Sequence, residues 1–138
     1  MKRHILKDLQ EYPNRIYAIV CTKPFTQLVW NLSETLDIPF IRGADVLQQI
    51  DGSKLSWARC LYVDKDLETT YSVVKNKGVD NKLAPELRNV DAFLIETNHS
   101  LTFQLGLEKI SKTTFVDFCF EVKHNMINQE TDFLLYLE

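Results

Sequence analysis

Two carboxylates, Glu86 and Asp91, are the first candidates for chemistry in this sequence, and they stand five positions apart. Carboxylates can act as a general acid and a general base, or bind a hard cation through their oxygens. The structural alternative is that Glu86 favours the amino end of a helical turn begun by Pro85, and that Asp91 turns the chain into the next strand. We favour the structural interpretation, because no further carboxylate or glycine loop supports a metal site.

A second candidate combines a cysteine with a histidine. Cys21 ends one predicted strand and His99 follows another, so the two could form a nucleophile and its base. Nothing in the sequence shows that they meet, and a buried thiol with a histidine in a loop is the commoner arrangement. His4 and His124 do not stand at metal-ligand spacing from His99. We therefore expect no metal.

Charge and composition exclude several classes of protein. The 138 residues include 16 Lys and Arg against 19 Asp and Glu, and this net charge of −3 has the wrong sign for covering nucleic-acid phosphates. The four glycines are never close together, so phosphate-binding loops are absent and we expect no cofactor. Lys7 and Asp8 interrupt the apolar stretch that a signal peptide needs, and no stretch approaches a membrane span. We expect one globular domain, residues 1–138, in the cytoplasm, without nucleic acid or membrane as a partner.

The candidate residues lie on or beside five predicted strands. Continuous or alternating apolar runs, rich in β-branched and aromatic residues, predict these strands at 15–22, 57–63, 69–75, 91–97 and 114–122. A short strand is expected at 40–42 and one helical turn at 85–87. The polar residues 43–54, with candidate turns at their two glycines, predict irregular structure.

A helix is predicted over residues 24–36. Its apolar residues recur at helical spacing along one face: Phe25, Leu28, Val29, Leu32 and Leu36. We expect this face to be buried against a sheet that contains Ile19 and Phe93. Trp30 lies beside the apolar face and has two interpretations, either flanking the core or anchoring a partner, since tryptophan is enriched in interfaces.

Residues 101–111 fit two patterns. Leu101, Phe103, Leu105 and Leu107 alternate as in a strand. Phe103, Leu107 and Ile110 also fit one helix face, which a polar residue just before it could cap. The pattern alone does not decide between strand and helix.

The segment 84–94 reads Ala-Pro-Glu-Leu-Arg-Asn-Val-Asp-Ala-Phe-Leu and resembles the signature of a bacterial family named for its own motif, the IPExxxVDY family. Four residues match the motif: Pro85, Glu86, Val90 and Asp91. Alanines replace the isoleucine and tyrosine of the motif. The opening strand, the helix with its Trp-Asn pair and residues 74–77 are similar too, so the resemblance runs from residue 15 to the C-terminus.

The resemblance implies a fold element but no activity. The family is uncharacterised and found mainly in Bacteroidetes, so it supplies no catalytic residues and points to a bacterial protein. Because the region looks helical in relatives, the resemblance favours a second helix over residues 101–111.

The last residues form an apolar end of the chain. They are Phe133, Leu134, Leu135, Tyr136 and Leu137. Five apolar residues are rarely left in water, so we expect this end to dock as a strand or to fill an interface. If the segment is extended, both of its faces are apolar, and one of them is available to a second chain. Phe133, Leu135 and Leu137, together with Trp30, are therefore the candidate interface residues.

The sequence predicts an α+β fold, a single mainly antiparallel sheet with two helices packed on one face. We expect a non-enzymatic module that acts through protein contacts, with an unknown protein partner and a homodimer as its form. The alternative is a small-molecule-binding protein or an enzyme, with a pocket near Glu86, Asp91 and His99.

Overall fold

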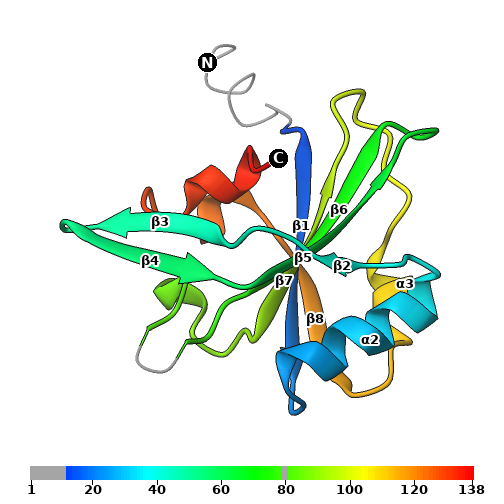
Figure 1. Cartoon of the computed structure of the whole chain (residues 1–138), viewed down its shortest axis with the longest axis horizontal. Coiled ribbons are helices and arrows are strands. Elements are labelled where there is room, and N and C mark those ends of the chain that lie inside the picture. The colour runs from blue at the N-terminus through cyan, green and yellow to red at the C-terminus, as the bar shows by residue number, and fades with distance from the viewer. Residues whose placement is uncertain (1–11, 79–80) are drawn as a thin grey trace.

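The computed structural model describes residues 12–78 and 81–138. Six strands form one sheet in the order β2-β5-β6-β7-β1-β8, and every neighbouring pair is antiparallel (Figure 1). The strands are β1 (Asn14–Cys21), β2 (Ile41–Arg42), β5 (Arg59–Asp64), β6 (Thr69–Lys75), β7 (Ala92–Thr97) and β8 (Val116–Val122). The mainly antiparallel sheet of an α+β protein is therefore confirmed, and each predicted strand is present within one or two residues.

A separate hairpin stands where the sequence predicted irregular structure. It consists of β3 (Val46–Ile50) and β4 (Ser53–Trp57). Its turn residues Asp51 and Gly52 both have positive φ, 49° and 80°, as a type I′ hairpin turn requires. The prediction was wrong because the alternation is inverted: the polar Gln48 is buried, whereas its neighbour Leu47 is 76% exposed.

The helices α2 (Phe25–Leu36) and α3 (Leu107–Ser111) both contribute to one buried cluster on the sheet. Its members from the helices are Leu28, Val29, Leu32 and Ile110, and those from the sheet include Tyr17, Ile19, Val73 and Leu94. The predicted burial of the α2 face and its contact with Ile19 are confirmed. The same sheet contains Phe93, as predicted, but successive strand residues point to opposite faces, and Phe93 lies in the cluster on the other side.

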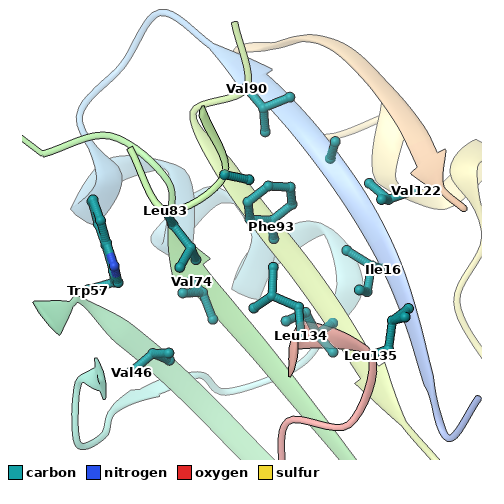
Figure 2. Packing of buried hydrophobic residues seen from close by; sticks show 13 residues of the cluster. Ile16, Val46, Trp57, Val74, Leu83, Val90, Phe93, Val122, Leu134 and Leu135 are labelled. Atoms are coloured by element: carbon teal, nitrogen blue, oxygen red, sulfur yellow. The ribbon is translucent and has the colours of Figure 1, made fainter. Parts of the chain in front are cut away.

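The other face of the sheet is covered by the hairpin, the loop before β7 and the C-terminal segment (Figure 2). A buried polar residue, Gln48, joins these parts. Its Oε1 accepts a hydrogen bond of 3.0 Å from Trp57 Nε1. Its Nε2 donates to the carbonyl oxygens of Leu83, at 3.1 Å, and Glu130, at 3.3 Å.

The C-terminal segment is not the strand that was one expectation. Residues Asp132–Leu135 form the 3₁₀ helix η3, in which Leu134 is fully buried and Leu135 is 5% exposed. The side-chain Nδ2 of Asn14 donates to the carbonyl oxygens of Leu134, at 2.7 Å, and Leu137, at 2.9 Å. Because this one side-chain amide binds two carbonyl oxygens that are three residues apart, it stabilises a helical rather than an extended conformation of the segment. Leu135 thus belongs to the core of its own chain, and Phe133 and Leu137 pack against it.

The helix predicted over 101–111 is correct only for its last five residues, which form α3. Residues 101–106 are not helical. Glu96 accepts the backbone N–H groups of Gln104 and Leu105, which a helix over 101–111 would bond to carbonyls one turn earlier. Asn98 Oδ1 accepts those of Ser100, at 2.9 Å, and Thr102, at 3.2 Å. No helix in the described part of the chain is long and apolar enough to cross a membrane.

Candidate functional site

A row of polar side chains crosses the face of the sheet that carries the helices. The strand register sets Tyr62 of β5 opposite Tyr71 of β6, Tyr71 opposite Glu96 of β7, and Glu96 opposite Arg15 of β1. Residues directly opposite each other in antiparallel strands have side chains on the same face, with Cβ atoms about 5 Å apart. The four residues therefore form one continuous line, which we call the polar row.

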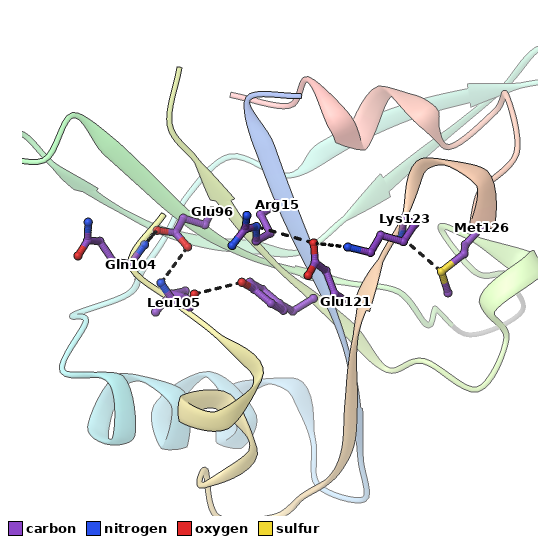
Figure 3. A network of polar contacts seen from close by, with 8 residues as sticks. Arg15, Glu96, Gln104, Leu105, Glu121, Lys123 and Met126 are labelled. Carbon is purple, nitrogen blue, oxygen red and sulfur yellow. Dashed lines mark hydrogen bonds and ion pairs between the residues drawn. The ribbon is translucent and has the colours of Figure 1, made fainter. Parts of the chain in front are cut away.

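Glu96 is the centre of the polar row and is fully buried. Its carboxylate accepts hydrogen bonds from the backbone N–H groups of Gln104, at 2.5 Å, and Leu105, at 3.1 Å (Figure 3). Burial raises the pKa of this carboxyl group, while the two N–H groups and the charge of Arg15 oppose the rise. The carboxylate thereby holds the 103–105 segment in its non-helical conformation over the sheet.

Two further side chains fasten the same segment. The hydroxyl of Tyr17 donates to the carbonyl oxygen of Leu105 at 3.2 Å. The Arg15 guanidinium lies over the ring of Phe103, 4.3 Å from its centroid, in a cation–π contact. Arg15 Nε also lies 3.7 Å from Glu121 Oε2 on β8 (Figure 3). The segment is therefore a fixed wall over the polar row.

A cavity of about 520 Å³ opens at the tyrosine end of the polar row. Tyr62 and Tyr71 line it from the sheet, Asp37 lines it from the end of α2, and Lys109 lines it from α3. Tyr71 is only 4% exposed although it lines the cavity. Burial, with the charges of Glu96 and Asp64, raises the pKa of Tyr71 to about 12, so its hydroxyl remains protonated at neutral pH.

The two carboxylates of the motif bind different parts of the chain. Glu86 Oε2 accepts hydrogen bonds from the backbone N–H of Asn128, at 2.7 Å, and the hydroxyl of Thr131, at 2.6 Å. Asp91 Oδ2 accepts one from the backbone N–H of Cys21 at 2.8 Å, and its Oδ1 lies 3.0 Å from Lys77 Nζ. Glu86 thus holds the C-terminal segment and Asp91 holds the end of β1, whereas the structural interpretation had placed their roles at the turn begun by Pro85 and at the entry into the next strand.

The rest of the motif is structural as well. Pro85 begins the 3₁₀ helix η1 (Pro85–Leu87), and Val90 is 2% exposed in the core. The buried Asn76, which was not a candidate, organises this loop. Its Nδ2 donates to the carbonyl oxygens of Leu87, at 3.1 Å, and Val90, at 2.7 Å, and its Oδ1 accepts the N–H of Ala84 at 2.7 Å.

His99 lies away from the other candidates. Because β1 and β7 are antiparallel, Cys21 lies beside Asp91 at one end of β7, whereas His99 follows the opposite end. There His99 Nε2 lies 3.1 Å from Glu138 Oε1, and both side chains are exposed. The structure therefore does not join His99 with Cys21, nor with Glu86 and Asp91. Burial also raises the pKa of the Cys21 thiol, which disfavours a nucleophilic thiolate.

Several apolar side chains are exposed near the last strand of the sheet. Phe118 on β8 is 60% exposed and Phe115, just before that strand, is 41% exposed. Trp30 on α2 is 64% exposed, so its interpretation as a core residue is wrong. Its neighbour Asn31 donates from Nδ2 to the carbonyl oxygen of Thr114 at 3.1 Å, so this part of α2 lies against the segment that leads into β8.

Sequence reasoning missed the polar row because strand register cannot be obtained from one sequence. One signal was available: Glu96 is a carboxylate at the end of an otherwise apolar strand, and buried carboxylates need partners. Within the described residues, no group of three or more His, Cys, Asp or Glu side chains could hold a metal ion. Comparisons of the chain with protein-family models, with curated proteins and with solved structures found no match.

Proposed function

We propose that this chain is a non-enzymatic module that acts through protein contacts, and that its partner is a second copy of itself. The outer edge of β8 carries this proposal. Within the described residues, β8 pairs with β1 alone, so seven consecutive residues form an edge of the sheet. Such an edge offers backbone N–H and C=O groups to another strand.

The two edges of the sheet differ, and the difference favours a closed dimer. The opposite edge is β2, which has only two residues. A head-to-tail contact would have to join β8 to that short edge, whereas a two-fold contact joins β8 to its own copy. The longer edge therefore favours an isologous pair over an open chain of subunits.

Charge complementarity selects one register for this pair. In an antiparallel pair with Phe120 opposite its own copy, Asp117 faces Lys123 of the second chain, twice by symmetry. Lys123 follows β8 in an extended conformation, so it can continue the strand. Apolar residues also match, since Phe118 then faces Val122.

The neighbouring register lacks this match. With Cys119 opposite its own copy, Asp117 would face Glu121, and like charges directly opposite each other are destabilising. The register centred on Phe120 thus places acid opposite base, where this neighbouring register places acid opposite acid.

Exposed aromatic surface supports the same contact. The rings of Phe118 and Phe120 lie 5.7 Å apart on one face of β8, and Phe118 is 60% exposed. Its burial against a second chain would contribute favourably, because aromatic side chains dominate interface energetics. Trp30 lies at the margin of this interface in our proposal, and Leu135, which its own core uses, has no part in it.

Sedimentation velocity of the full chain tests the proposal. We expect a dimer, and we expect Phe118→Ser to weaken it by about tenfold, since it removes about 1.4 kcal/mol or more of apolar burial. Leu47→Ser, at a 76% exposed position of the hairpin, is the matched control and should leave the dimer unchanged. A full-length chain that stays monomeric at the highest soluble concentration would refute the proposal.

We also propose that the chain is a divergent bacterial member of the IPExxxVDY family and that it works in the cytoplasm. The support is that all four matching residues have an internal role, as Pro85 begins a turn, Val90 is buried and the two carboxylates bind separate segments. A sequence motif whose residues stabilise the fold does not require that any of them be catalytic. An experimental structure of an accepted family member tests this: its motif carboxylates should hold the C-terminal segment and the end of the first strand.

A further inference from the structure

The cavity at the tyrosine end of the polar row has the size of a small-molecule site. Its volume of about 520 Å³ lies within the range of pockets that hold small ligands, roughly 300–1,000 Å³. Three parts of the chain form it: the end of α2 with the three residues that follow, the strands β5 and β6, and the wall that runs from Gln104 through α3 to Lys112.

Charges of both signs line this cavity from different elements. The acidic residues are Asp37, at the end of α2, and Asp64, on β5. The basic residues are Lys109, on α3, and Lys112, which directly follows α3. A ligand with one positive and one negative group is therefore the chemistry that these side chains match, because each end can meet its opposite.

The charged groups retain hydrogen-bonding capacity for a ligand. Asp64 Oδ1 accepts the N–H of Leu67 at 3.1 Å, and the second carboxylate oxygen of Asp64 can accept a hydrogen bond from a ligand. Lys109 Nζ donates once, to the carbonyl oxygen of Gln104 at 3.0 Å, and an ammonium has three protons. Lys112 is exposed and lies 3.8 Å from Glu108, a distance too long for a strong ion pair.

Tyr71 supplies a buried donor. The residue is only 4% exposed and lines the cavity, and its hydroxyl, protonated at neutral pH, can donate a hydrogen bond. A ligand oxygen in the cavity would accept this hydrogen bond. The hydroxyl thus points to an acceptor, such as a carboxylate, as one end of the ligand.

Apolar side chains complete the lining. Leu36 and Ile38 line the cavity beside Pro39, and Leu105 faces it from the wall. Glu96 fixes Leu105 through the backbone, so this wall is already formed before a ligand arrives. A preformed wall lowers the entropic cost of binding.

We propose that this cavity binds a free α-amino acid with an apolar side chain. The ammonium group contacts Asp64 and Asp37, and the carboxylate contacts Lys112, Lys109 and the hydroxyl of Tyr71. The apolar side chain packs on Leu36, Ile38 and Leu105. This site lies over β5 and β6 and is separate from the outer edge of β8, so its test does not depend on the dimer.

Two-dimensional NMR of the ¹⁵N-labelled full chain, titrated with L-leucine and L-phenylalanine, tests the proposal. We expect saturable shifts at residues of the cavity, with a Kd in the millimolar range or below. N-acetyl-L-phenylalanine lacks the ammonium and L-phenylalanine amide lacks the carboxylate, and each should bind about tenfold more weakly than the free amino acid. Equal binding of all three probes would overturn the proposal, as would the absence of saturable shifts for both amino acids.

Variants locate the site independently. Asp64→Asn keeps an acceptor for the N–H of Leu67, and Lys112→Gln removes one exposed charge, so neither should unfold the protein. Each should weaken L-phenylalanine by about tenfold, whereas Lys54→Gln, on the hairpin, should have no effect. Unchanged affinity in both cavity variants would contradict the proposal even if the amino acid binds.

Discussion

Polar residues inside this protein organise loops rather than perform chemistry. Asn76, Gln48 and Glu96 are all buried, and each binds backbone groups of a segment that has no regular structure of its own. Buried backbone groups must be paired, and loops supply few partners for one another. In each of these loops, one buried side chain from a distant part of the sequence supplies the missing hydrogen bonds.

Asn76→Ala should be strongly destabilising. It removes three hydrogen bonds and leaves the carbonyl oxygen of Val90 and the N–H of Ala84 without a partner, while the carbonyl oxygen of Leu87 keeps the N–H of Val90. We expect the free energy of unfolding to fall by about 2–4 kcal/mol, measured by urea denaturation. Asn125→Ala, at an exposed position, is the control and should stay within about 0.5 kcal/mol of wild type.

Glu96 gives a pH dependence of defined sign. Its folded-state pKa is raised by burial, so the folded state binds a proton more readily than the unfolded state. The stabilisation that this provides is fully present below the unfolded pKa, near 4.5, and is lost as the pH rises through the folded pKa. Wild type should therefore lose stability relative to Glu96→Gln as the pH is raised over a range that begins near 4.5. A difference between the two proteins that stays constant over that range would contradict this account.

Among the elements, those with a strong local pattern could be predicted from the sequence. The apolar runs of β1 and β7 and the helical stripe of α2 decide their conformation locally. The β3–β4 hairpin could not be predicted from the sequence, because the burial of Gln48 depends on hydrogen bonds to the distant carbonyl oxygens of Leu83 and Glu130. The conformation of residues 101–106 could not be predicted either. Their N–H groups bind the side chains of Glu96 and Asn98, and hydrophobic periodicity does not reveal such partners.

The helix α2 provides a stability test at this scale. Leu32 is fully buried between α2 and the sheet, so Leu32→Ala should lower the free energy of unfolding by about 2–5 kcal/mol. Gln27→Ala, on the exposed side of the same helix, should change it by less than about 0.5 kcal/mol. Equal effects of the two substitutions in urea denaturation would mean that α2 does not pack as described.

For the candidate site, too, some features could be predicted from the sequence and others could not. Glu86 and Asp91 each bind backbone groups, but their partners lie in distant segments that the sequence did not indicate. The polar row could not be found, because Tyr62, Tyr71 and Glu96 come from three strands whose register only the fold provides.

At the scale of the whole molecule, one sheet is covered on both faces by its own chain, and β8 is the longer of its two outer edges among the described residues. The helices contribute to the buried cluster on one face, and the C-terminal segment contributes to the buried cluster on the other. Self-association through β8 is therefore the central claim about function.

A charge-swap cycle measured by sedimentation tests that claim most directly. Asp117→Lys and Lys123→Asp each place like charges opposite each other in the register centred on Phe120, so each should weaken the dimer by about tenfold or more. The double variant restores opposite charges and should restore the dimer, with circular dichroism verifying that all four proteins are folded. A double variant as weak as the single ones, or a wild type that sediments as a monomer at every concentration, would contradict the account.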